Sequence, residues 1–334
     1  GVVVHDAVRL YCRRWKDGLS HFSFWIPTTL HRGPNMKAGH WVVRGWLATA
    51  LALMAFTASA GSAKEIRKQA EASVLLTGTV EVAADGSLRG YRLDHPEMID
   101  APVRDLIDRN VKSWSFEVDS LPDGVPANAT IVNTMSILVV AKKLENDDYA
   151  LRLAGSYFSP KENEPGTELT YKRHTPPTYP VDAVRARVTG KVYLLVKIGR
   201  DGDVEDAMAE QVNLGVVAWN EKEMERWRNV LAASALKAVK QWTFTVPTRG
   251  EQADQPYFLA RVPIEYDIHR EGSAKPSKYG EWATYIPGPR LPNPWDKVED
   301  YPGFAPDALA ANGGLYTGGG LRLKSPLQGT VDGG

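Results

Sequence analysis

The sequence predicts an α+β protein of two tandem small domains, each a three-stranded antiparallel sheet with packed helices, followed by an irregular C-terminal tail. Three observations predict this fold. Two stretches of alternating apolar residues each end at an Asp-Gly pair, each is followed by an amphipathic helix with a Trp-x-Phe exit, and each half then runs into a last strand. The order strand, turn, strand, helix, strand therefore occurs twice.

The first element of each half is a predicted strand that ends in a tight turn. The strands lie in SVLLTGTVEVAADGSL, residues 73–88, and in TGKVYLLVKIGRDGDV, residues 189–204. Their alternating apolar residues, typical of half-buried strands, are Leu76, Val80 and Val82 in the first and Val192, Val196 and Ile198 in the second. The turns are Asp85-Gly86 and Asp201-Gly202. Asp-Gly favours a hairpin turn because glycine adopts the left-handed backbone without strain, so these aspartates are read as turn residues and not as metal ligands.

An amphipathic helix that leads into the Trp-x-Phe exit is predicted in each half, in the matching stretches 102–116 and 230–244, and the second helix is expected to start earlier, near Asn220. Apolar residues spaced by three or four positions share one helical face. They are Val103, Ile107, Val111 and Trp114 in the first half and Leu231, Ala235, Val239 and Trp242 in the second. In the second half, Asn220 followed by Glu221 and Glu223 indicates a capped start. The expected core anchors are Trp114, Phe116, Trp242 and Phe244.

These elements divide the chain into segments. The domains are expected at residues 70–142 and 176–268, and they end in the strands Asn128–Val140 and Tyr257–Ile268. Residues 143–175 contain Pro160, Pro165 and Gly166 and are predicted to be a linker. Residues 269–334 are rich in Gly and Pro without sustained periodicity, so they predict a tail of low order that packs locally through Trp282, Trp295 or Tyr301.

The N-terminal region is predicted to carry a secretory signal. Met36, Lys37 and Arg44 precede an apolar core and the small residues Ala58-Ser59-Ala60, which predicts a signal peptide over residues 36–63. The apolar run is shorter than the ~20 residues of a spanning helix, with an uncleaved anchor as the alternative. Residues 1–35 are expected to lie upstream of the natural start. The expected location is the periplasm, or the periplasmic side of the inner membrane if the anchor stays.

Composition and spacing argue against several classes of function. Forty basic and forty acidic residues give no electrostatic case for nucleic-acid binding. Beyond residue 63 the histidines are His95, His174 and His269, which are not spaced as a metal pair, and the one cysteine of the chain is Cys12. No nucleophile elbow or phosphate loop occurs. We expect no enzyme activity, no metal and no cofactor, and a dispersed Ser/His/Asp or paired-carboxylate site is the alternative left open.

The second half resembles the C-terminal domain of TonB, the energy transducer of Gram-negative envelopes. The matching pieces are Tyr179-Pro180, Gly190-Lys-Val, Asp201-Gly202-Asp-Val, the run ending in Trp242-Thr-Phe244 and a last strand near Arg261–Tyr266. The first half resembles a degenerate copy that lacks the Tyr-Pro pair. The resemblance implies a small α+β domain whose last strand binds an extended segment of an outer-membrane transporter.

The resemblance implies a periplasmic binding or adaptor protein that engages an extended peptide or envelope protein by strand addition. The implied partner-binding residues are Tyr179, Pro180, Leu259, Arg261, Pro263 and Glu265. Tyr179-Pro180 is equally consistent with a device that starts a strand. The chain departs from a force-transmitting TonB because only Lys64–Ala72 separate the apolar run from the first domain. The alternatives are a membrane-anchored energy transducer for TonB-dependent transport and a self-associating envelope module that forms a homodimer.

Overall fold

The computed structural model describes residues 63–118, 126, 129–144, 148–161, 164–250, 252–268, 279–295, 303–310, 314–317, 321–327 and 330–332. Residues 1–35 and nearly all of the predicted signal peptide lie outside this part of the chain. Within the described ranges no helix is long and apolar enough to cross a membrane. The protein is α+β, and its strands pair in mostly antiparallel sheets.

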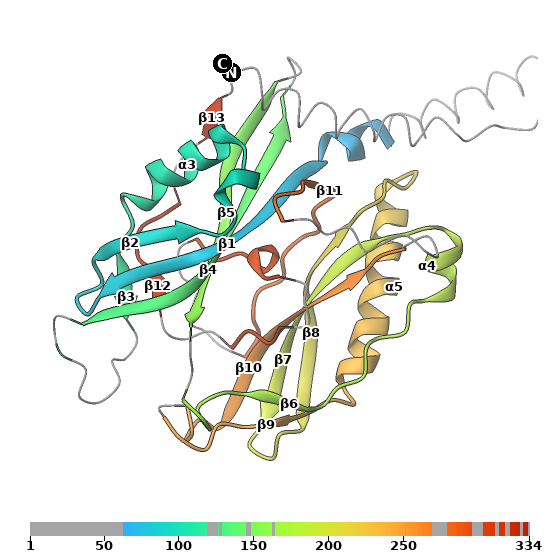
Figure 1. Ribbon diagram of the computed structural model, residues 1–334. Coiled ribbons are helices and arrows are strands. Elements are labelled where there is room, and N and C mark those ends of the chain that lie inside the picture. Colours follow the sequence, from blue (N-terminus) through green and yellow to red (C-terminus); the bar gives the residue numbers. More distant parts are fainter. Residues whose placement is uncertain are drawn as a thin grey trace, which may run out of the picture.

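The larger sheet is built mainly from the first half of the chain (Figure 1). Its strand order is β11-β1-β4-β5-β13, with β2 pairing a separate stretch of β1. The strands are β1 (Glu71–Ala83), β2 (Leu88–Leu93), β4 (Thr130–Lys143), β5 (Tyr149–Pro160), β11 (Ala283–Tyr285) and β13 (Thr330–Asp332). After η1 (Pro96–Met98), helix α3 (Ala101–Val111) buries Val103, Ile107 and Val111 in the core of this half, as predicted. Trp114, which was expected on the same helical face, is buried beyond the end of α3.

The smaller sheet has the order β10-β7-β8 and belongs to the second half. Its strands are β7 (Gly190–Gly199), β8 (Val204–Leu214) and β10 (Tyr257–Tyr266). Helices α4 (Val181–Arg185) and α5 (Glu221–Val239) pack on one face of this sheet, because their buried residues share a core with alternate residues of β7. The predicted cap is confirmed, since the Asn220 side chain accepts a hydrogen bond from the Glu223 N–H at 2.9 Å.

The two Asp-Gly turns have the same geometry. Gly86 and Gly202 adopt φ angles of 82° and 84°, in the left-handed region that glycine enters without strain. Each glycine carbonyl accepts a hydrogen bond from the aromatic residue at the helix exit, Phe116 at 2.9 Å and Phe244 at 2.8 Å. A Cβ atom on either glycine would lie 2.0 or 2.1 Å from the carbonyl oxygen of that phenylalanine. Both turns are therefore fixed by close backbone approach.

The segment expected to be a linker is largely strand. β5 pairs along β4 from Asn133 to Lys143, so the first sheet is wider than the three strands that the sequence predicts. Alternating Tyr149, Leu151 and Leu153 are buried, and this period-two pattern is the strand signal within the segment. Further along, β6 (Thr170–Arg173) pairs with β9 (Thr243–Thr245).

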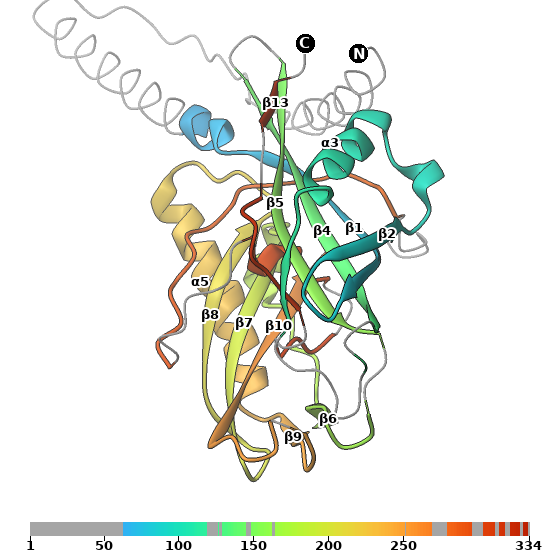
Figure 2. The ribbon, with the colours of Figure 1, turned by 90° about the vertical axis from the view of Figure 1, so that its left-hand side faces the viewer.

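The described parts of the tail are ordered, contrary to the expectation of low order. They supply β11 to β1, β13 to β5, and β12 (Leu321–Leu323) to β3 (Phe116–Val118). Trp282 is buried in the core of the first half. Figures 1 and 2 show the tail, coloured orange to red, running between the two main sheets, where η2 (Pro306–Ala308) lies. The tail satisfies backbone groups at strand edges that would otherwise lack partners.

Candidate functional site

The outer edge of β10 is the surface that the sequence selects for partner binding. β10 pairs with β7 in unbroken register from Tyr257 to Tyr266. Successive residues of an antiparallel strand direct their N–H and C=O groups to opposite sides. Arg261 directs both groups away from β7, so the backbone groups of Leu259, Pro263 and Glu265, at the same alternation, also point away from β7, while the Pro263 ring itself is buried. The structure therefore aligns the four residues selected on this strand along one edge.

The tail occupies this edge at its centre. The Arg261 N–H donates to the Tyr316 carbonyl at 2.7 Å, and the Tyr316 N–H donates to the Arg261 carbonyl at 3.0 Å. This pair of bonds is an antiparallel bridge. Pro263, two residues further along, has no N–H to donate, and a proline is a common way to limit pairing at a strand edge. A strand that pairs with Arg261 can therefore form the full set of backbone hydrogen bonds with β10 only on the side of Leu259, because Pro263 offers no donor on the other side.

The Arg261 side chain belongs to a buried charge cluster. Glu210 on β8 is 1% exposed and accepts from the Arg261 Nε at 2.8 Å. The same carboxylate accepts from the Arg290 guanidinium of the tail at 2.9 Å. The Arg261 guanidinium also lies 4.5 Å from the centre of the Phe304 ring. The Glu210 carboxylate thus joins the β10 edge to Arg290 of the tail, and the Arg261 guanidinium contacts a second part of the tail at Phe304.

The other selected residues have different surroundings. Glu265 lies on the surface with Lys191 at 3.6 Å, a pair of small energetic value in water. The Tyr179 hydroxyl donates to the Val188 carbonyl at 2.6 Å, and its ring packs edge-on against Tyr266. Burial raises the pKa of Tyr179 to about 12, with smaller contributions from Asp267 and Tyr266. Pro180 is the residue that precedes α4.

Tyr179 and Pro180 therefore position the start of α4 in this structure, away from the bridged centre of the β10 edge.

The four aromatic anchors of the two helix exits are all buried, each with less than 5% of its surface exposed. Trp114 and Phe116 pack edge-on at 6.1 Å in the first half. In the second half the Trp242 indole N–H donates to the Thr175 carbonyl at 2.9 Å.

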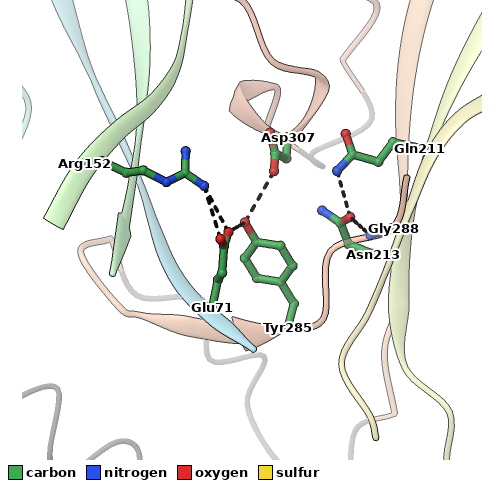
Figure 3. A network of polar contacts seen from close by, with 7 residues as sticks. All are labelled: Glu71, Arg152, Gln211, Asn213, Tyr285, Gly288 and Asp307. Carbon is green, nitrogen blue, oxygen red and sulfur yellow. Dashed lines mark hydrogen bonds and ion pairs between the residues drawn. The ribbon is translucent and has the colours of Figure 1, made fainter. Parts of the chain in front are cut away.

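A polar layer lies between the two main sheets, beside the edge (Figure 3). Arg152 on β5 pairs with Glu71 on β1 at 3.2 Å. The Tyr285 hydroxyl of β11 lies 3.4 Å from a carboxylate oxygen of Glu71 and 3.4 Å from one of Asp307. A hydroxyl has one hydrogen to donate, so it satisfies one of these carboxylates at a time. This layer brings β1, β5, β11 and η2 together.

Protonation in this layer is displaced from ordinary values. Burial raises the pKa of the Asp307 carboxyl and the nearby Glu71 carboxylate adds to this, while the Tyr285 hydroxyl and Arg152 act in the opposite direction. Burial also raises the pKa of Tyr285, and Asp307 and Glu71 add to it. Burial also raises the pKa of Tyr193, which lies on the face of β7 opposite α5. Low dielectric thus favours the neutral forms here.

The second part of the polar layer orders the tail against β8. The Gln211 side-chain N–H donates to the Asn213 side-chain oxygen Oδ1 at 2.9 Å, and the same oxygen accepts from the Gly288 N–H at 3.0 Å (Figure 3). Ile286 exchanges two backbone hydrogen bonds with Leu214, at 2.7 and 3.1 Å. The tail therefore covers the edge of β8 as well as the centre of β10.

Comparisons with known proteins add no family to this arrangement. No protein-family model, no curated protein and no solved structure matches the chain. In the part of the chain that the structure describes, no group of three or more His, Cys, Asp or Glu side chains gathers as a metal site. The interpretation of the site rests on the contacts of the β10 edge.

Several residues of this site were not selected from the sequence. They are Glu210, Tyr285, Phe304, Asp307 and Tyr316. Four of them lie in the tail, which shows no sustained periodicity that would predict where it docks. The available signal was the isolated apolar pair Leu315-Tyr316 within a glycine-rich stretch.

Proposed function

We propose that the chain is a non-catalytic binding or adaptor module that takes an extended peptide along the outer edge of β10 by strand addition. One observation carries this proposal: Arg261 already exchanges two backbone hydrogen bonds with an extended residue, Tyr316. Strand addition uses this same pair of main-chain bonds and requires no preformed cavity. The edge of the three-stranded sheet therefore has the geometry that this function needs.

The proposal includes a finer description of the fold, in which the second half is a TonB C-terminal-like domain. Its support is the strand order β10-β7-β8 together with α4 and α5 on one face. The first half has the corresponding order β4-β1-β2 and a helix, α3, at the corresponding place. However, β5 pairs along the outer edge of β4. We therefore assign peptide binding to the second half alone.

The proposed partner is an extended segment of a cell-envelope protein, with outer-membrane transporters as the first class to test, and the proposed location is the periplasm. The balanced charge of the chain fits a partner recognised through backbone hydrogen bonds more than through long-range attraction. Under this proposal the chain needs no cofactor, because binding and not chemistry is its activity.

A proline at Leu259 tests strand addition directly. Leu259 directs its N–H outward, so Leu259→Pro removes one donor from the free edge and leaves the bonds between β10 and β7 in place. Leu259→Ala is the matched control, because it removes the side chain and keeps the N–H. The probe is a fluorescein-labelled peptide with the sequence of residues 312–321, NGGLYTGGGL, here called the tail peptide.

Fluorescence anisotropy with the full chain is expected to give weak binding, with a Kd up to about 1 mM. Leu259→Pro should lose this binding, and Leu259→Ala should keep it. Circular dichroism and the thermal midpoint establish that both variants are folded. Unchanged affinity in a folded Leu259→Pro chain would reject strand addition at β10.

A further inference from the structure

Tyr316 meets the β10 edge as a peptide residue would. Its backbone makes the antiparallel bridge to Arg261, and its ring packs edge-on against Tyr157 of β5 with centres 5.1 Å apart. Its hydroxyl donates to the Ala310 carbonyl at 2.9 Å, and burial raises the pKa of that hydroxyl. The residue therefore combines main-chain pairing with an aromatic side chain in a defined cluster, which are the two components of recognition by strand addition.

The surroundings of the Tyr316 ring are held independently of it. Tyr157, Phe304 and Leu309 are buried as one cluster, and Tyr316 packs against that cluster. The tail segment that supplies Phe304 and Leu309 is fixed to the first sheet, because the Gly303 carbonyl accepts from the Ser156 N–H at 2.7 Å. The cluster around the ring is therefore anchored on the first sheet by a bond that does not involve Tyr316.

A second bond anchors the same segment. The Ser136 hydroxyl donates to the Ala308 carbonyl at 2.9 Å, and Ala308 is fully buried against Leu138 and Val140 of β4. Residues 303–310 are thus part of the packed structure. They can keep their position when residue 316 leaves the edge.

The sequence around Tyr316 lowers the free-energy cost of leaving the edge. Glycines stand at positions 313 and 314 before it and at 318, 319 and 320 after it. Glycine loses more conformational entropy on ordering than any other residue, so a glycine-flanked contact recovers more entropy when it opens. Local opening of this kind requires no change in the rest of the fold.

We propose that residues 314–317 are an internal stand-in for the ligand of the β10 edge, and that the external ligand is an extended peptide with an aromatic residue opposite Arg261. This inference rests on the proposed function. The peptide runs antiparallel to β10, and its residues after the aromatic one lie opposite Leu259, because Pro263 lacks a donor on the other side. The chain thereby regulates its own binding edge, since a ligand must first displace Tyr316.

Tyr316→Pro is the first test, because it removes the N–H that bonds to Arg261. The apparent Kd of a ligand equals its intrinsic Kd divided by the fraction of protein with an open edge. The tail peptide should therefore bind the variant about tenfold or more tightly than it binds the unaltered chain if under one tenth of that chain is open. Tyr316→Ala is the second variant, since it removes the ring and keeps the backbone donor.

Leu291→Pro is the matched control. Its N–H donates to the Glu210 carbonyl at 2.8 Å, so the substitution also removes a tail bond, but at β8, the opposite edge of the same sheet. The affinity of Leu291→Pro for the tail peptide should equal that of the unaltered chain. The tail peptide with alanine in place of Tyr316 should bind Tyr316→Pro more weakly than the tail peptide itself.

The outcomes separate this inference from the proposed function. Equal affinity of the unaltered chain and both folded Tyr316 variants overturns the stand-in and leaves strand addition intact. An equal gain in Tyr316→Pro and Leu291→Pro also overturns it, because general loosening would then explain the gain. Equal binding of the alanine peptide overturns the aromatic preference. Absence of binding in every chain, Tyr316→Pro included, overturns both proposals.

Discussion

β4 and β10 follow the same order of elements in the two halves, yet their outer edges have different neighbours. β4 pairs with β1 on one side and with β5 along Asn133–Lys143 on the other. β10 pairs with β7 on one side and is bridged on the other by Tyr316. β4 is an interior strand of its sheet, whereas β10 is a terminal strand of a three-stranded sheet.

This difference shows that the outer edge of a strand is paired according to the chain segment that follows the strand. β5 follows β4 through a short connection, in which the Leu144 N–H donates to the Asp148 carbonyl at 2.8 Å. The partner of Arg261 comes from position 316, much further along the chain. In the part of the chain that the structure describes, the tail pairs with β10 through one bridge whereas β5 pairs along Asn133–Lys143, so fewer backbone bonds must break for the β10 contact to open. The outer edge of β4 is therefore closed by a continuous strand, whereas the outer edge of β10 is covered at Arg261 by a bridge.

The largest expected effect comes from breaking the feature that both halves share. Gly86→Ala and Gly202→Ala should each lower the free energy of unfolding by about 3 kcal/mol, because each places a Cβ against a backbone carbonyl at a positive φ. Denaturant unfolding measures the effect. If the halves are structurally equivalent up to the helix exit, the two losses should agree within about 1 kcal/mol.

Gly90→Ala is the control for these two variants. A Cβ on Gly90 meets nothing closer than a Glu81 side-chain oxygen at 3.9 Å, so its stability should change by less than about 0.5 kcal/mol. A mild effect at one turn and a severe effect at the other would contradict the equivalence of the two turns.

The sequence predicted the elements that depend on local patterns. The period-two residues around Val80 and Val196, the helix face of Val111 and the Asn220 cap are all found where expected, because pairing, burial and capping of this kind act over a few residues. The sequence did not predict which segments of the chain pair with the outer edges of β4 and β10. β5 was hidden by the prolines and glycine around it, and its register on β4 depends on contacts between strands.

The site was predicted to the same extent. Arg261 was selected through the resemblance of the last strand to a known domain, but Glu210, Arg290 and Tyr316 reach it from other elements. Such long-range docking leaves no period in the sequence, because single bridges and one buried carboxylate hold it. The resemblance to a known domain gave the edge, and the structure added the segment that lies on it.

A smaller effect is expected from the charge cluster that holds the β10 edge to the tail. Glu210→Gln leaves two guanidinium groups without their carboxylate and should lower the free energy of unfolding by about 2 kcal/mol. The loss should be smaller than for a fully buried pair, because the Arg261 and Arg290 side chains keep 19% and 33% of their surface exposed. Thermal and denaturant unfolding measure it.

Glu205→Gln is the matched control on the same strand. Its partner Lys197 lies at 2.8 Å, but the Glu205 side chain is 46% exposed, so Glu205→Gln should lower the free energy of unfolding much less than Glu210→Gln. Equal losses in the two variants would show that the buried cluster does not fix the tail to β10.

The smallest effect is a change in the pH dependence of stability, and it distinguishes the polar layer from the turns. Burial raises the pKa of folded Asp307, so the folded chain binds this proton more tightly than the unfolded chain. This contribution to stability is present at acidic pH and is lost as the pH rises through the folded pKa. Asp307→Asn removes this fall in stability at higher pH, because asparagine does not ionise, and it keeps a polar group facing Tyr285, Glu71 and Arg152. The thermal midpoint of the variant relative to the unaltered chain should therefore be higher at pH 7.5 than at pH 4.

Asp85→Asn should give the opposite sign. The Ser87 side chain and N–H donate hydrogen bonds that lower the pKa of Asp85, so its contribution is present above the unfolded pKa and is lost as the pH falls. Its variant should be relatively less stable at pH 7.5 than at pH 4. Midpoint differences with the same sign in both variants would contradict the assignment, because a turn carboxylate held by hydrogen bonds and a tail carboxylate buried between sheets must respond to a proton in opposite ways.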